Sequence, residues 1–215
     1  MEKELFAKAF SEQLDKNFEK YKHHLDFKYR VFYELEPLVF QVTKCLILNM
    51  HYAAITSTNF FLERLLKVAL INKAVGIRGI PVEEWTTVYE VPSKRYGSLV
   101  LSKSIEQCEI EGLIDAKEKH LLDKEVRDQI RNGFSHAEAE KILKKLPDEV
   151  EMYSGSFNEI GKIQPVMLNA KVIPPLQTVH METFAEVNAP EYFDFVMYLM
   201  GVIENRLVEF DKNTP

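Results

Sequence analysis

Apolar residues recur at helical spacing along most of the chain. Residues 2–22 form a charged amphipathic pattern that predicts a helix, and residues 27–36 carry an apolar pattern that Pro37 interrupts. Residues 42–74 contain neither Pro nor Gly, and their apolar positions recur every three to five residues. This pattern predicts one long, heavily buried central helix that ends at Gly76.

An irregular segment over residues 82–97 is followed by a return to helical spacing. Residues 82–97 mix β-branched, aromatic and Pro residues without a helical period, which predicts a loop or a short extended insertion. A helix resumes after it and stops at Gly112, a residue suited to a left-handed helix end. Asp115 with Glu118 three residues later has the spacing of a capping box. We therefore expect another helix over about 116–145.

Residues 146–190 contain several prolines and glycines, and this composition predicts a non-helical insertion. Within it, 150–153 and 163–172 have the composition of short strands that could pair, with Pro165 confining its strand to a sheet edge. Helical spacing returns over 192–210 and predicts a closing helix. Together these patterns indicate a mainly α protein, one domain over residues 1–215, with a partly extended or β-containing insertion before the last helix.

Composition narrows the class of protein. The 215 residues are 46% hydrophobic and 28% charged, which suits one globular core. Cys45 and Cys108 lie far apart without a metal-ligand spacing, so we expect buried free thiols. The N-terminal residues lack the apolar stretch of a secretion signal, and polar residues interrupt the apolar run over 38–55. A cytoplasmic protein without a membrane partner is the expectation.

The formal net charge of −6 argues against a protein that coats nucleic acid non-specifically, because such binding depends on many Lys and Arg residues. Any RNA contact must be local. Basic and acidic residues alternate around residues 124–145, which makes a mixed surface there and no basic stripe.

One segment of the helix predicted over 116–145 carries candidate chemistry. Its sequence over 131–136 is Arg-Asn-Gly-Phe-Ser-His. Arginine offers a permanent cation with a planar fork of donors for phosphate, and histidine exchanges a proton near neutral pH. On an ideal helix Arg131 and His136 lie about 140° apart, so one helix presents half a site. Two copies that meet across a two-fold axis could complete it.

These residues resemble the motif of the HEPN superfamily, in which an Arg, commonly followed by a polar residue, is separated from a His by four to six intervening positions. Residues 59–67, Asn-Phe-Phe-Leu-Glu-Arg-Leu-Leu-Lys, are similar to the family's buried helix, and residues 101–114 are similar to the segment before its motif helix. The resemblance covers roughly 43–75 and 98–145, with the closing helix in outline. It implies an antiparallel helical bundle that dimerises and, in many members, a metal-independent endoribonuclease.

Carried over residue by residue, the resemblance implies catalytic roles for Arg131 and His136. Asn132 would position His136 or a phosphate oxygen, and Glu63 could orient Arg131. Neither a cofactor nor a metal ion is implied. The implied partners are an RNA substrate, a second copy of the chain in a homodimer, and an antitoxin or other regulatory protein, as in members that act in defence or stress response. Glu138 stands where some toxin members carry a modifiable Tyr.

A second interpretation is a non-catalytic HEPN-like dimerisation or interaction module, which the acidic charge favours. For the other residues that could bind a metal or a base, a role in the fold is the preferred interpretation. His23 and His24 lie on a charged helix without a partner at ligand spacing, which indicates a solvated face. Aromatic residues at helical spacing are expected to pack in the core, and these are Phe60, Phe61, Phe193 and Phe195.

Overall fold

The computed structural model describes residues 3–135, 139–144, 147–154 and 164–213. It is mainly α-helical, as the sequence predicts. The elements are α1 (Lys3–Tyr21), η1 (Lys22–Leu25), η2 (Tyr33–Leu35), α2 (Glu36–Ile47), α3 (His51–Val75), η3 (Val82–Glu84), α4 (Trp85–Tyr96), α5 (Leu101–Ile110), α6 (Ala116–Leu121), η4 (Leu122–Arg131), α7 (Asn132–Ser135), α8 (Ala139–Leu143), β1 (Glu149–Ser154), β2 (Gln164–Asn169) and α9 (Pro174–Asn213).

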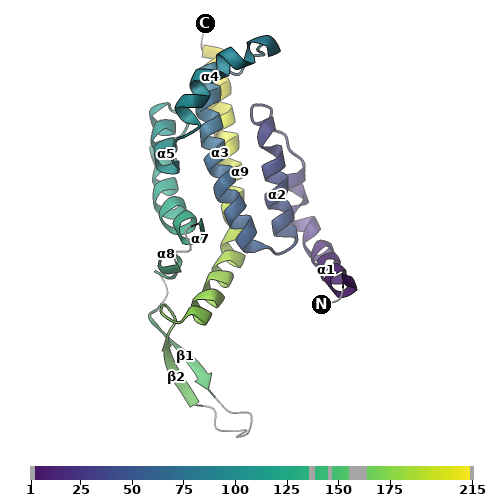
Figure 1. Ribbon diagram of the computed structural model, residues 1–215, viewed down its shortest axis with the longest axis vertical. Helices are drawn as coiled ribbons and strands as arrows, with labels where there is room; N and C mark the ends of the chain where they lie inside the picture. The colour runs from purple at the N-terminus through teal and green to yellow at the C-terminus, as the bar shows by residue number, and fades with distance from the viewer. Residues whose placement is uncertain (1–2, 136–138, 145–146, 155–163, 214–215) are drawn as a thin grey trace.

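Helices α3 and α9 form the centre of the bundle. They lie side by side along the long axis of the molecule, with α2 against one side of α3 and α5 against the other (Figure 1). Phe61 and Leu65 of α3, and Phe193 and Leu199 of α9, are fully buried. Because burial of large apolar side chains dominates the free energy of folding, this pair of helices holds the fold together.

The long helix predicted over residues 42–74 is in fact two helices. α2 ends at Ile47 and α3 begins at His51, and between them Asn49 has a φ of 54°. Asn tolerates this left-handed conformation better than most residues. The side-chain amide of Asn17 on α1 donates to the Ile47 carbonyl at 2.9 Å and to Asn49 Oδ1 at 3.0 Å. A contact with a distant helix therefore stabilises this break, which neither Gly nor Pro marks.

The segment predicted as a loop over residues 82–97 is mostly the helix α4, so that prediction is wrong. Pro81 precedes the short helix η3, and the indole of Trp85 donates to the Ile80 carbonyl at 3.0 Å. Pro92 lies inside α4. α4 contacts α3, where Tyr96 is buried, and most of its other residues are exposed. Packing of its few large residues outweighs the unfavourable helix propensity of Pro92.

The predicted helix ends at Gly76 and Gly112 and the predicted capping box at Asp115 are confirmed. Gly76 follows α3 with a φ of 88°, and Gly112 follows α5 with a φ of 68°, both in the region where glycine is favoured. The Asp115 carboxylate accepts hydrogen bonds from the backbone N–H groups of Lys117 and Glu118, each at 2.8 Å. Glu118 in turn accepts from the Asp115 N–H at 2.7 Å, so the capping box is complete.

The predicted strand pair is present, whereas the predicted length of the non-helical insertion is wrong. β1 and β2 form an antiparallel ribbon in which Tyr153 faces Pro165. The closing helix α9 begins at Pro174, not near residue 192, and contains Pro190. Proline suits the first turn of a helix, where its missing N–H costs nothing. Ala185 and Ala189, one turn apart, are fully buried and extend the apolar face of α9 toward its start.

No described helix is both long enough and apolar enough to cross a membrane.

Candidate functional site

The motif lies near the end of a helical segment that starts at the capping box and runs through α6, η4 and α7. Leu122 and Val126 are buried, Ile130 packs partly against the core, and Gly133 is buried. These residues, spaced three to four apart, form a buried stripe along the segment. This stripe orients the segment and leaves its other side to solvent.

The beginning of this segment is attached to α9 by an ion pair. Arg206 of α9 lies 2.5 Å from Glu118 and also donates to the Leu113 carbonyl at 2.9 Å. The segment thus has one end tied to the centre of the bundle.

The backbone over residues 122–131 is a π-helix, in which each N–H donates to the carbonyl five residues earlier. The angle of about 140° predicted between Arg131 and His136 stays a prediction, because His136 lies outside the described residues. Local π-helical geometry often occurs at functional sites. The segment ends in α7, which carries the second motif residue, Asn132.

Arg131 and Asn132, the first two motif residues, contact each other. Both are partly exposed, and Arg131 Nη1 donates to Asn132 Oδ1 at 3.3 Å. His136 lies outside the described residues, so its predicted place beside Asn132 stays a prediction. The described part of the motif therefore contributes a cation and an amide to the solvent-facing border of the buried stripe.

Phe134 holds the motif against both central helices. Its ring contacts Tyr52 of α3 edge-to-face, with the centroids 5.3 Å apart, and it also lies 5.9 Å from the ring of Phe184 on α9. Aromatic pairs of this kind add stabilisation beyond their buried area. Because Tyr52 and Phe184 are far from Phe134 in sequence, the resemblance and the local pattern gave no signal for this contact.

Arg127, one turn before Arg131, is engaged by two carboxylates. Its guanidinium lies 2.9 Å from Asp123 and 3.1 Å from Asp128. These pairs neutralise Arg127 locally and leave it less suited to bind phosphate. The predicted mixed-charge surface around the motif is therefore present, with acids placed directly on one of its arginines.

Glu63 pairs with Lys67, one turn further along α3, at 2.8 Å. It lies eleven residues beyond Tyr52, which corresponds to about 16 Å of helix. The contact between Tyr52 and Phe134 marks where α3 meets α7, so Glu63 is well separated from that meeting point. The suggested role of Glu63 in orienting Arg131 gains no support from this placement. The neighbouring Phe60, predicted as a core residue, is 62% exposed, whereas Phe61 is buried.

A hollow of about 390 Å³ lies at the other end of α3, away from the motif. Arg30, Arg78, Trp85 and Tyr89 are among its lining residues. The guanidinium of Arg78 already binds Asp211, at 3.1 Å between Nε and Oδ2. None of the predicted site residues lines this hollow.

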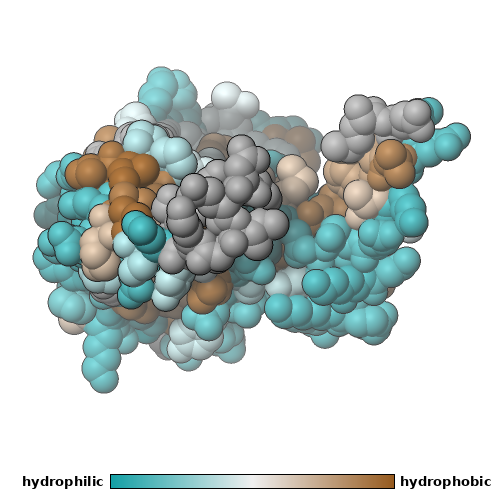
Figure 2. Space-filling view, turned by 90° about the horizontal axis from the view of Figure 1, so that it is seen from below, coloured by the Kyte–Doolittle hydropathy of each residue, from teal (hydrophilic) through white to brown (hydrophobic). Residues whose placement is uncertain are grey.

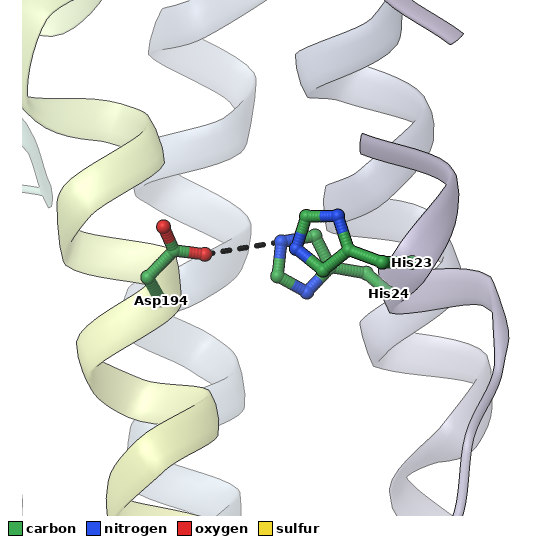
Figure 3. A group of neighbouring side chains, drawn as sticks. All are labelled: His23, His24 and Asp194. Carbon is green, nitrogen blue, oxygen red and sulfur yellow. Dashed lines mark ion pairs between the residues drawn. The ribbon is translucent and has the colours of Figure 1, made fainter. Parts of the chain in front are cut away.

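The structure corrects the prediction of a solvated face for His24, whereas His23 is exposed as predicted. His24 is buried, and its Nε2 lies 3.0 Å from Asp194 Oδ1 on α9, while the ring of His23 lies beside that of His24 at a tilt (Figure 3). The prediction of a solvated face fails because α9, about 170 residues later, covers His24. Of the two cysteines, Cys108 is buried and Cys45 partly buried, and both are free thiols. Burial raises the pKa of each thiol, which disfavours the reactive thiolate.

Comparison with known proteins gives no relative: no family model, curated protein or solved structure matches the chain.

Proposed function

We propose that the chain is a metal-independent endoribonuclease of HEPN type, which cleaves RNA through a composite Arg/His site formed where two copies meet. The observation that carries the proposal is the placement of Arg131 beside Asn132 on the partly exposed border of a helix that is otherwise anchored in the bundle. The proposal rests on this placement together with the motif resemblance.

The chemistry follows from the residue types. The ribose 2′-oxygen attacks the adjacent phosphorus, the bond from phosphorus to the 5′-oxygen breaks, and the 2′-hydroxyl proton passes to a base. His136 would transfer that proton or orient the phosphate, and Arg131 would stabilise the negative charge that grows on the phosphoryl oxygens. The 5′-oxygen leaves with a proton. The products are a 2′,3′-cyclic phosphate and a 5′-hydroxyl.

The need for two copies follows from the placement of the motif on one segment. A single chain offers one Arg131, held at the edge of its own buried stripe, and a second motif across a two-fold axis would supply the facing groups. We further propose that the protein acts in the cytoplasm in defence or stress response and that an antitoxin or other regulatory protein controls it. Recovery of a stable partner with the tagged protein from its native host tests the last point.

The direct test of the chemistry is cleavage of end-labelled total RNA and tRNA in EDTA, with wild type and His136→Ala prepared by matched purifications. We expect cleavage by the wild type alone and 2′,3′-cyclic phosphate ends. Equal cleavage by both proteins would show that the activity is a contaminant or uses other residues. Cleavage that leaves 3′-hydroxyl ends would exclude the proposed attack by the 2′-oxygen.

A second candidate function, a non-catalytic dimerisation or interaction module, is favoured by exposed apolar residues on α1. Seen from below, apolar side chains gather at the edge of the molecule where α1 lies (Figure 2). Five large apolar residues of this helix are at least 38% exposed: Leu5, Phe6, Phe10, Leu14 and Phe18. An apolar surface of this kind is typical of protein contacts.

Molar-mass measurement in solution tests this candidate with Phe6→Ser and Phe10→Ser combined, against Ile110→Ser as a control at an exposed apolar residue of α5. A module that associates through α1 becomes monomeric only in the first variant. If that module has no other role, the wild type shows no RNA cleavage in EDTA.

A further inference from the structure

Three side chains that can bind a metal ion meet between η1 and α9. His23 and His24 come from η1, directly after α1, and Asp194 comes from the middle of α9 (Figure 3). The Nε2 atom of His24 lies 3.0 Å from Asp194 Oδ1, and the two imidazole centroids are 3.9 Å apart. One ligand atom from each of the three residues lies within 4.8 Å of the others.

The three residues differ in how firmly they are held. The His24 side chain is 7% exposed, and its ring packs edge-on against Phe193 with the centroids 4.8 Å apart. The Asp194 side chain is 61% exposed, and His23 is exposed. One ligand is thus fixed by the core, and the other two can adjust around it from the solvent side.

The electrostatics at His24 suit a ligand. Burial, with a smaller effect from the neighbouring His23, lowers the pKa of His24, although the Asp194 carboxylate opposes this shift. Metal ions bind the neutral imidazole form of histidine. The Asp194 carboxylate beside His24 supplies negative charge, which favours binding of a divalent cation.

We propose that His23, His24 and Asp194 bind a divalent transition-metal ion of the Zn²⁺ class, with water in the remaining position. Two imidazole nitrogens and one carboxylate oxygen are a ligand set that Zn²⁺ uses, with bonds of about 2.0–2.2 Å. In a tetrahedral site with such bonds the ligand atoms are about 3.3 Å apart. Rotation of the two exposed side chains that moves their ligand atoms by roughly 1–2 Å brings the three atoms to this separation.

This site is separate from the proposed RNA-cleaving site, and the inference does not depend on that function. Asp194 lies ten residues from Phe184, the residue of α9 that contacts Phe134 beside the motif. Ten residues correspond to about 15 Å of helix. A metal here would join η1 to α9 and so hold α1 against the bundle, a structural role.

The test is a titration of metal-free wild-type protein with Co²⁺, whose visible absorption reports coordination, followed by displacement with Zn²⁺. The same titration is made with His23→Gln and Asp194→Asn, which change exposed side chains and spare the buried His24. Asn at position 194 retains an oxygen that can accept a hydrogen bond from His24, so it keeps that contact while removing the charge. His120→Gln, at an exposed histidine of α6, is the control.

We expect one Co²⁺ per chain for the wild type and for His120→Gln. In each ligand variant the affinity for Co²⁺ should fall by more than roughly 10- to 100-fold, which is the typical cost of losing a residue that only hydrogen-bonds to a metal ligand. Zn²⁺ should raise the Tm of the wild type and leave that of His23→Gln unchanged. Absence of saturable binding by the wild type below about 1 mM Co²⁺ would overturn the proposal. So would equal affinity in the wild type and both ligand variants, or an equal loss in His120→Gln.

Discussion

The centre of the bundle and the motif segment are built in different ways. In α3 and α9, large apolar residues are fully buried, and even a polar contact there, from the Tyr192 hydroxyl to Asn59 at 2.9 Å, is buried. The segment α6–η4–α7 buries only one side and carries Arg131 and Asn132 on its partly exposed border. Stability and the candidate chemistry therefore reside on separate elements, so substitutions should affect them separately.

The largest effect is expected at Phe61 in the centre of the bundle. Phe61→Ala removes a fully buried ring and leaves a cavity, and we expect it to lower the free energy of unfolding by about 3–5 kcal/mol. Phe60→Ala, at the adjacent and largely exposed position, should change it by less than about 0.5 kcal/mol. Urea denaturation of the two variants measures both values. Similar losses at both positions would contradict the placement of α3.

The next effect is expected at the buried polar contact between the central helices. Tyr192→Phe removes the hydroxyl that donates to Asn59, and we expect a loss of about 1–2 kcal/mol. Tyr198→Phe, at a residue 64% exposed on the same helix, is the control and should have no measurable effect. Thermal unfolding of the pair decides whether this contact contributes to stability.

A smaller effect is expected at the start of the motif segment. Asp115→Ala removes the carboxylate that accepts from two backbone N–H groups, so the first turn of α6 should open more readily. Lys117→Ala, inside the same turn, keeps the cap. Amide hydrogen exchange should become faster over α6 in the first variant only, while α3 and α9 keep their protection. Faster exchange throughout the molecule would show that the two regions unfold together.

The smallest effect that we expect is a dependence of the free energy of unfolding on pH. Burial lowers the pKa of His24 below its ordinary value of 6.5, so the unfolded chain binds more protons than the native one as the pH falls through 6.5. Stability should therefore decline as the pH falls below about 7. His51, whose pKa burial also lowers, contributes in the same direction. The decline should be shallower in His24→Asn, and an equal decline would show that His24 is not responsible.

Local signals account for the parts of this fold that the sequence predicted. The helix at the N-terminus, the glycine after α5, the capping box and the strand pair each depend on residues close together in the chain. The break at Asn49 was missed because Asn17, on another helix, makes it favourable. α4 and the start of α9 were missed because their prolines were interpreted as helix breakers, although Pro174 and Pro175 begin a helix.

The same distinction applies to the candidate sites. The motif is a local pattern, so Arg131 and Asn132 could be singled out from the sequence and do contact each other. The anchoring of Phe134 by Tyr52 and Phe184 is non-local and could not be predicted. The burial of His24 beside Asp194 was missed for the same reason, because the two residues meet only when α9 packs on η1.

The most direct measurement of the central claim compares two arginines one turn apart on the same segment. Arg131→Ala and Arg127→Ala remove the same charge, but Arg127 is engaged by Asp123 and Asp128, whereas Arg131 belongs to the motif. Initial rates of RNA cleavage in EDTA should fall by at least about 100-fold in Arg131→Ala, the scale of losing a group that stabilises transition-state charge. Arg127→Ala should remain within about threefold of the wild type. Equal rates for the two variants, or an inactive wild type, would contradict the claim that this motif cleaves RNA.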